Sequence, residues 1–497
     1  METRSRRLKR LMREEERVDR ISQLPHSIRV LILSFLPTKE VVKMILVPPF
    51  RDVWTRSRNL TFDQNEFHDS NSRIPDAPHY NTRFVNFIRN MLRVHVGETI
   101  DEFHLIFWLN LIYEEHTTHS HSSYLKVKSM ESEITHWIKF AVRKSVKVLN
   151  LNLLASRGGR VIKYELPDLV FRCNDLREFM LAGCVIRKPL VTQLNSLRKL
   201  SLRDIELSDN IMNSIVEGCS VLEELSFLSC SGVRMLRLAN PRVKRLIISI
   251  GWFEEKLVKK KLEIICPHVT SLEISGAIPL VDLKNSSSVL DASLRYDTIF
   301  FKCAPKKYEK MRTLLEQLTQ TGVLVMCSKM ILVFTTWALR NMPFPVFSSR
   351  SLTLELQFSK WLLPGIRGIL RNSSHLETLT IYIHSEPLPN RIMESNQALW
   401  MWEHHDFDDG DYWKSREPDV ALGMLKTIKI YGYIIEPSVL PIIGFLMKKA
   451  LVLEEMVISN SATVFEAVDI DTDELFELCK NLLKLPRASP SAVINFC

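Results

Sequence analysis

Two short stretches with helical spacing of apolar residues lie near the start of the chain. In the first, which Pro25 can open, apolar positions recur at i, i+3, i+4 and i+7: Ile28, Leu31, Ile32 and Phe35. Pro37 ends this helix, and Thr38 is a suitable N-cap for a second helix that carries Glu40 in its first turn. The apolar positions of the second helix are Val41, Val42, Ile45 and Leu46. Two helices of this size cannot bury all of these side chains against each other, so the rest of the chain or a partner must cover the surplus.

From Asn59 to about residue 140 the spacing is mostly helical. A second pattern, apolar-x-x-apolar-x-apolar, then recurs and predicts short strands that present alternate residues inward. Its matches begin at Val146, Leu176, Leu197, Leu222, Val233, Val243 and Val269. The steps between them are 30, 21, 25, 11, 10 and 26 residues. Several steps fit the period of about 20–29 residues of leucine-rich repeats, and the short ones suggest compressed units. A single strand and helix cannot close a core, so the units must stack into a solenoid.

The pattern is less regular towards the C-terminus. Strand-like runs at 323–326 and 330–334 suggest distorted repeats, and the regular spacing returns at 352–356 and at Leu376. After residue 420, a strand, a helix and a second strand follow one another at 425–430, about 438–449 and 453–458. This order repeats the solenoid unit, so we expect the segment to extend and cap the stack.

Composition and charge exclude several classes of protein. The 497 residues are 46% hydrophobic and 25% charged, which is typical of a soluble globular protein of about two to four domains. The net charge is +9, but residues 1–13 hold six Lys or Arg against one Glu and supply +5 of it. The remainder carries 60 basic and 56 acidic residues, so it offers no clustered basic surface for nucleic acid. No apolar run reaches the length of about 18 residues that a membrane span requires.

The N-terminal basic run and the cysteines bear on the compartment. Arg6–Arg10 is a solvated tail, which we favour, a nuclear address or a membrane-surface contact, and we expect a nuclear or cytoplasmic protein. The nine cysteines include no CxxC pair, which favours buried reduced thiols inside the cell.

Two stretches hold residue types that can bind metal. Histidines and glutamates crowd residues 114–121, and tryptophans, histidines and aspartates crowd residues 400–413. Neither spacing fits a known metal motif, and we read the first as a solvated loop and the second as an acidic linker. The chain also has no phosphate-binding glycine loop, no GxSxG and no HExxH. We therefore expect no catalytic residue, no cofactor and no metal.

The first stretch resembles an F-box, and specifically the F-box of the plant-type family that joins this module to leucine-rich repeats and a C-terminal FBD region. The matching features are Asp19–Ser22, Leu24-Pro25, Leu33–Thr38, Val41-Val42, and Arg51 before Trp54. The resemblance implies docking on a Skp-like adaptor and, through it, on a cullin. The residues that would carry this docking are Leu24, Pro25, Ile28, Ile32, Leu36 and Val42.

One departure from the family pattern affects this docking. The chain reads Val47-Pro48-Pro49-Phe50 where the family usually has a basic run, and two prolines cannot continue a helix. We therefore expect a third helix that is broken or starts late, and the missing basic residues would weaken adaptor affinity.

The expected fold class is α/β: a small helical F-box, then a leucine-rich-repeat solenoid (an irregular α/β horseshoe), then an FBD-like strand–helix–strand cap. The expected segments are a basic tail (1–18), the F-box (19–58), a mostly helical connector (59–140), the solenoid (141–386), an acidic and aromatic linker (387–420) and the FBD-like region (421–497).

Three functions are compatible with this organisation. The first is a non-catalytic substrate-recognition subunit of a Skp–cullin–F-box ubiquitin ligase, whose repeats capture a protein substrate that the sequence does not identify. The second is a repeat scaffold that binds proteins but no longer enters a ligase, which the prolines at 48 and 49 motivate. The third, a hydrolase on an α/β scaffold, has no motif in its favour.

Overall fold

The computed structural model describes most of the chain. The described residues are 20–67, 77–108, 121–153, 164–186, 193–250, 261–277, 280–298, 305–357, 359–384, 422–435, 439–460 and 472–496. The basic tail, the linker at 387–420 and all but the last residue of the histidine-bearing stretch lie outside this part. The chain forms two compact units, Met1–Leu222 and Glu223–Cys497.

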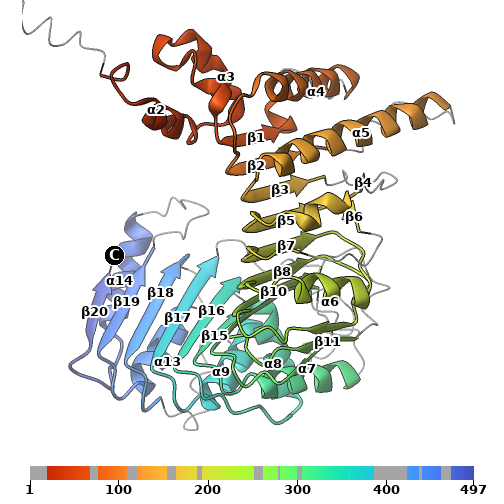
Figure 1. The fold of residues 1–497 in the computed structure, drawn as a ribbon. Helices are drawn as coiled ribbons and strands as arrows, with labels where there is room; N and C mark the ends of the chain where they lie inside the picture. The colour runs from red at the N-terminus through yellow and green to blue at the C-terminus, as the bar shows by residue number, and fades with distance from the viewer. Residues whose placement is uncertain are drawn as a thin grey trace, which may run out of the picture. The chain divides into compact units, whose positions relative to one another are not determined.

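The N-terminal unit begins with two short helices, α2 (His26–Leu33) and α3 (Thr38–Lys43) (Figure 1). Glu40 lies in the first turn of α3, as predicted. The predicted cap was wrong, because Pro37 is the N-cap residue and Thr38 is the first helical residue. The hydroxyl of Thr38 instead accepts a hydrogen bond from the backbone N–H of Thr61 at 2.6 Å, in the first strand of the unit.

A third α-helix does not form after α3. The chain makes the 3₁₀ turns η1 (Met44–Leu46), η2 (Pro48–Phe50) and η3 (Trp54–Arg56). Val47, before the first proline, is extended, with φ −100° and ψ 112°. The residue before a proline is pushed out of the α region, so this break is the one that the proline pair predicts.

Parallel strands build the main sheet of the N-terminal unit. In spatial order they are β1 (Asn59–Asp63), β2 (Glu102–Ile106), β3 (Val148–Asn152), β5 (Glu178–Ala182) and β7 (Lys199–Arg203). The helices α4 (Ala77–Val94), α5 (His121–Arg143) and α6 (Asp209–Glu217) follow β1, β2 and β7. A short pair of strands, β4 (Tyr164–Glu165) and β6 (Cys184–Val185), lies beside this sheet. The sheet thus begins at Asn59, within the stretch expected to be a connector, and not near residue 141.

The C-terminal unit holds a longer parallel sheet in which spatial order follows chain order (Figure 1). Its strands are β8 (Glu224–Leu228), β10 (Arg245–Ile250), β12 (Ser271–Ala277), β14 (Asp291–Thr298), β15 (Val323–Cys327), β16 (Ser351–Gln357), β17 (Thr378–His384), β18 (Thr427–Gly432), β19 (Glu455–Ser459) and β20 (Val493–Phe496). The strand–helix–strand cap is confirmed, since β18 and β19 extend the sheet beyond β17 in parallel register.

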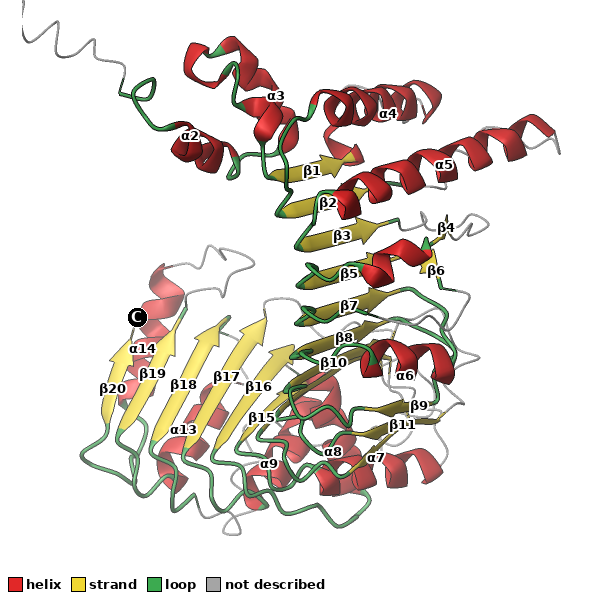
Figure 2. Cartoon of the chain, in the orientation of Figure 1, coloured by secondary structure: helices red, strands yellow, loops and turns green. Residues whose placement is uncertain are grey.

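Helices line one face of this sheet (Figure 2). They are α7 (Pro305–Gln317), α8 (Ser328–Leu339), α9 (Leu363–Arg371), α13 (Val439–Lys449) and α14 (Thr472–Leu483). The run at 330–334 was predicted as a strand and is part of α8, so that prediction was wrong. This helix is buried on nearly every side, from Met330 to Trp337, so its sequence has no polar face to reveal the helical period.

Short strands replace the helix in some repeats. β9 (Met235–Arg237), β11 (Lys261–Ile265) and β13 (Leu280–Lys284) form a second parallel sheet. The match at Val233 leads into β9 and is not a compressed repeat. The two short steps of 11 and 10 residues together make one repeat of ordinary length. This repeat holds two strands, β8 in the main sheet and β9 in the second sheet.

Alternate residues of the strands form the core. In β16 and β17 the inward residues Leu352, Leu354, Leu379 and Ile381 are almost completely buried, while their neighbours stay half-exposed. One face of the sheet therefore packs on the helices, and the other face (the open face) lies toward solvent. Within the described residues, no helix is long and apolar enough to cross a membrane.

Replacing Gly432 by alanine should destabilise the C-terminal unit. Gly432 has φ +98°, and a Cβ there would lie 2.1 Å from the carbonyl oxygen of Ile383 on the neighbouring strand. We expect Gly432→Ala to lower the free energy of unfolding by about 2–4 kcal/mol, because strain and overlap add. Denaturant unfolding measures this loss of stability. Hydrogen exchange of β17 and β18 reports whether these two strands open more often.

Gly423→Ala is the matched control, because a Cβ at Gly423 meets nothing within 4 Å. It should change the free energy of unfolding by no more than about 0.5 kcal/mol. Equal stability of the two variants would contradict the close approach of β17 and β18.

Candidate functional site

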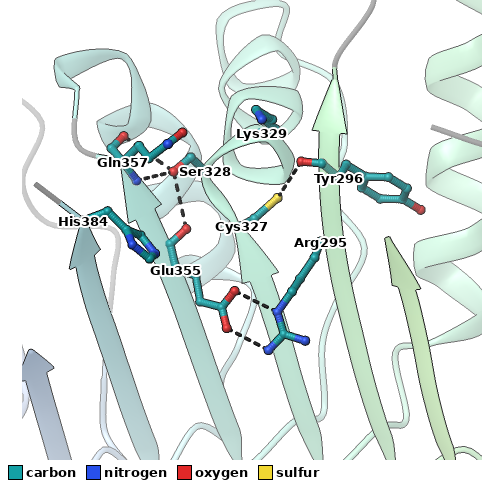
Figure 3. A pocket seen from close by; sticks show the side chains of 8 residues that line it. All are labelled: Arg295, Tyr296, Cys327, Ser328, Lys329, Glu355, Gln357 and His384. Carbon is teal, nitrogen blue, oxygen red and sulfur yellow. Dashed lines mark hydrogen bonds and ion pairs between the residues drawn. The ribbon is translucent and has the colours of Figure 1, made fainter. Parts of the chain in front are cut away.

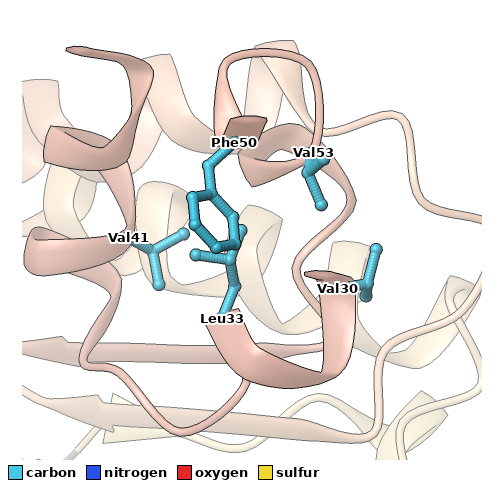
Figure 4. Packing of buried hydrophobic residues seen from close by; sticks show 5 residues of the cluster. All are labelled: Val30, Leu33, Val41, Phe50 and Val53. Carbon is cyan, nitrogen blue, oxygen red and sulfur yellow. The ribbon is translucent and has the colours of Figure 1, made fainter. Parts of the chain in front are cut away.

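A small apolar core holds the N-terminal helical module together. It consists of Val30, Leu33, Val41, Phe50 and Val53 (Figure 4), with Leu36, Met44 and Trp54 packed against it. Phe50 ends the turn that the two prolines begin, so the broken third helix still contributes its aromatic side chain to the core. Arg29 also donates a hydrogen bond to the carbonyl oxygen of Pro49, which ties this turn to α2.

The face of α2 that carries the apolar pattern points away from this core. Val30 and Leu33 face inward, whereas Leu31 is 52% exposed and Phe35, just after the helix, is 80% exposed. On the next elements, Leu46 is also 80% exposed. The exposed large apolar residues of this module are Ile21, Ile28, Leu31, Ile32, Phe35, Ile45, Leu46 and Val47. Burial of one such side chain is worth about 1.5–3 kcal/mol, so this set (the apolar surface) leaves a large favourable burial energy unused in the free chain.

The six residues predicted to dock an adaptor fall into two groups. Pro25, Ile28 and Ile32 are exposed, and Leu24, Leu36 and Val42 are half-buried. Leu36 packs against the internal core, so part of its side chain serves the fold. Sequence reasoning left Leu31, Phe35 and Leu46 out of this set, although the first two share the i, i+3, i+4, i+7 spacing with Ile28 and Ile32.

The helical module is bound directly to the first strand of the sheet. Besides the bond between Thr38 and Thr61, the side-chain amide of Asn59 donates to the carbonyl oxygen of Ser34 at 3.2 Å. Lys39 donates to the backbone oxygen of Glu66, and its ammonium lies 4.8 Å from the centre of the Phe67 ring. The module and the start of the repeats therefore form one packed body.

The open face of the C-terminal sheet carries a ladder of alternating charges. Arg295 on β14 forms two hydrogen bonds of 2.8 Å with the carboxylate of Glu355 on β16, and a contact of 3.4 Å with Glu273 on β12. Arg245 on β10 lies 3.9 Å from Glu273 and 3.8 Å from Glu224 on β8. The hydrogen bonds with Glu355 raise the pKa of Arg295 above its ordinary value. The ladder leaves this part of the face polar and suited to hydrogen bonding with a protein.

Two aromatic rings continue the ladder. The strand registers place Glu355 opposite Tyr382 on β17 and Tyr382 opposite Tyr431 on β18. The two rings are stacked, with centroids 5.3 Å apart and planes at 20°. Both side chains are half-exposed, so they offer an apolar platform beside the charges.

A pocket of about 210 Å³ opens at the carboxyl ends of β14, β15, β16 and β17 (Figure 3). Its lining residues are Arg295, Tyr296, Cys327, Ser328, Lys329, Glu355, Gln357 and His384. Ser328 begins α8, and its hydroxyl accepts a hydrogen bond from the backbone N–H of Gln357 at 2.6 Å.

The thiol that lines the pocket is not activated as a nucleophile. Burial raises the pKa of the Cys327 thiol, and the thiol donates to the carbonyl oxygen of Tyr296 at 3.4 Å, so it stays protonated. The described thiols Cys173, Cys184, Cys219 and Cys266 also have a pKa raised by burial. Among the described residues, no group of three His, Cys, Asp or Glu side chains is placed to hold a metal ion.

Comparison with known proteins supports the resemblance seen in the sequence. Residues 134–274 match the family of the leucine-rich repeats of FBD-associated F-box protein At5g56370. An F-box/LRR-repeat protein of Arabidopsis thaliana, At3g18150, is 29% identical over 383 residues, which cover 74% of this chain and 72% of that protein. The F-box/LRR-repeat protein At3g03360 is 25% identical, over 76% and 74% of the two chains. The FBD-associated F-box protein At1g66310 is 26% identical, over 57% and 59%. All three are plant proteins, and the predicted repeat fold is confirmed.

Proposed function

We propose that this chain, which is similar over most of its length to plant F-box/leucine-rich-repeat proteins, is a substrate-recognition subunit of a Skp–cullin–F-box ubiquitin ligase. Its helical module docks on a Skp-like adaptor, and its repeats capture a protein substrate. The chain itself supplies no catalytic group. It raises the rate of ubiquitin transfer by holding a substrate lysine close to the charged ubiquitin carrier.

The observation that carries the proposal is the apolar surface of the helical module. The module has its own core of Val30, Leu33, Val41, Phe50 and Val53, yet it leaves Leu31, Phe35 and Leu46 more than half exposed. A face that only joined the helices to the following sheet would be buried in this unit. Exposed apolar side chains in such a group are typical of a surface that a protein partner covers.

A repeat scaffold outside any ligase is the second candidate, because the prolines at 48 and 49 replace a basic run. The fold accommodates these prolines through the buried ring of Phe50 and the hydrogen bond from Arg29 to Pro49. The apolar surface lies mainly on α2 and on Ile45–Val47, before the prolines. The ligase role therefore remains our proposal.

Binding of the intact chain to a purified Skp-like adaptor tests the proposal. We expect a complex with a dissociation constant in the micromolar range or below, measured by calorimetry and by co-elution in gel filtration, and recruitment of a cullin when it is added. The apolar area supports this affinity, because two or three buried side chains supply about 3–9 kcal/mol, and a micromolar dissociation constant corresponds to about 8 kcal/mol. An intact, folded chain that fails to bind plant adaptors at micromolar concentrations would leave the scaffold as the function.

A further inference from the structure

We propose that the pocket at the carboxyl ends of β14–β17 receives an acidic side chain of the substrate, while an apolar side chain two residues away rests on Tyr382 and Tyr431. This inference rests on the proposed function, since it names the class of peptide that the repeats capture.

The charges of the pocket favour an anion. Arg295 pairs with Glu355 through two hydrogen bonds of 2.8 Å and also contacts Glu273, which does not line the pocket, at 3.4 Å, so both of its neighbouring carboxylates are engaged. Lys329 forms no ion pair with any described carboxylate, so its ammonium is left for a ligand. His384 adds a ring N–H that can donate a hydrogen bond. A cationic side chain would meet Lys329 and Arg295 without a free carboxylate to pair with.

The size of the pocket fits a side chain and not a whole domain. A volume of about 210 Å³ accommodates a carboxylate with its methylene stem, or a phosphorylated hydroxyl. The pocket opens beside the open face of the sheet, where an extended peptide can lie along the C-terminal end of β17. Figure 3 shows Arg295 and Glu355 reaching toward each other below the pocket, with Lys329 at its opposite rim.

The tyrosine pair fixes the second part of the motif. Tyr382 and His384 lie on the same strand, two residues apart and on the same face. That separation is about 6.6–6.8 Å, the distance between alternate residues of an extended peptide. A peptide with its acid at His384 therefore brings the residue two positions away to the stacked rings, where an aromatic or aliphatic side chain gains the most.

Peptide titrations test the pocket directly. The labelled full-length chain is titrated by microscale thermophoresis with a nonapeptide of Gly, Ser and Ala that carries one Tyr and, two residues later, one Glu. Matched peptides carry Gln, phosphoserine or Lys in place of the Glu, and the reversed peptides place the acid before the Tyr. We expect the Glu or the phosphoserine peptide to bind at least about tenfold more tightly than the Gln peptide, and the Lys peptide most weakly.

The variant Lys329→Glu should abolish this preference, and Lys329→Gln should reduce it. Lys329 is the second residue of α8, where an acidic side chain favours the helix, so the melting temperature should not fall. The control is Lys426→Glu, directly before β18, where the lysine lies 3.7 Å from Glu454 and outside the pocket lining; this variant should keep the preference.

The outcomes separate the two anions and the two proposals. Tighter binding of the phosphoserine peptide identifies a phosphorylated substrate, and tighter binding of the Glu peptide an acidic one. Equal affinity for the Glu, Gln and phosphoserine peptides, or a preference that survives in Lys329→Glu, overturns the pocket. Adaptor binding by Lys329→Glu should equal that of the intact chain, so loss of peptide binding alone leaves the ligase proposal standing.

Discussion

Changing Leu24 and Ile32 together to aspartate should lower the affinity for a Skp-like adaptor by at least about 100-fold. Both side chains belong to the predicted docking set, and Ile32 is exposed in the free chain. Loss of two apolar contacts forfeits about 3–6 kcal/mol, and each new carboxylate must also lose its water on binding. A difference of this size moves a micromolar dissociation constant beyond detection in calorimetry.

The control for this experiment is Val96→Asp. Val96 is 59% exposed, lies in the same unit and is outside the helical module. Its replacement should leave the adaptor affinity within about twofold. Circular dichroism and the melting temperature should show that both proteins keep their repeats. If the double variant binds as well as Val96→Asp does, the adaptor uses another surface.

Phe50→Ala should unfold the helical module while leaving the C-terminal unit intact. Phe50 is only 3% exposed and touches a core of a few residues, so its loss leaves a cavity that the small module cannot close. We expect a cost of about 3–5 kcal/mol, most of the stability that such a core provides. Hydrogen exchange followed by mass spectrometry should report faster exchange in α2 and α3 and unchanged exchange in β16 and β17.

Phe35→Ala is the matched control, since the same side chain is removed from an exposed position. Phe35 is 80% exposed, and its loss should change stability by no more than about 0.5 kcal/mol. If the two variants exchanged at the same rate in α2, the core in Figure 4 would not hold the module together.

The sequence predicts the buried positions of the repeats well, because the same apolar spacing recurs from one repeat to the next. Leu200, Leu225, Leu246 and Leu272 are all almost fully buried in strands, as their spacing indicates. The strands β1 and β2 were read as part of a helical stretch, although Leu60 and Phe62 alternate with polar neighbours. Five residues of alternation are too short a signal to outweigh the helical spacing of the longer stretches around them.

The candidate sites were predictable to different extents. The apolar surface depends on local spacing within about 30 residues, so the apolar patterns of the sequence contain most of its members, although the predicted docking set omits Leu31, Phe35 and Leu46. The pocket depends on the register of strands that lie far apart in the chain, and Arg295 meets Glu355 across 60 positions. No local pattern marks that pair. The place of β9 in the second sheet was not predictable for the same reason. Its apolar spacing matches that of the main-sheet strands, and only its pairing with β11 distinguishes it.

The attachment of the helical module to β1 has a mechanical consequence. The bonds from Thr61 to Thr38, from Asn59 to Ser34 and from Lys39 to Glu66 join the module directly to the first strand of the sheet. An adaptor bound to α2 would therefore also orient the first repeats, because they are hydrogen-bonded to the module that it binds.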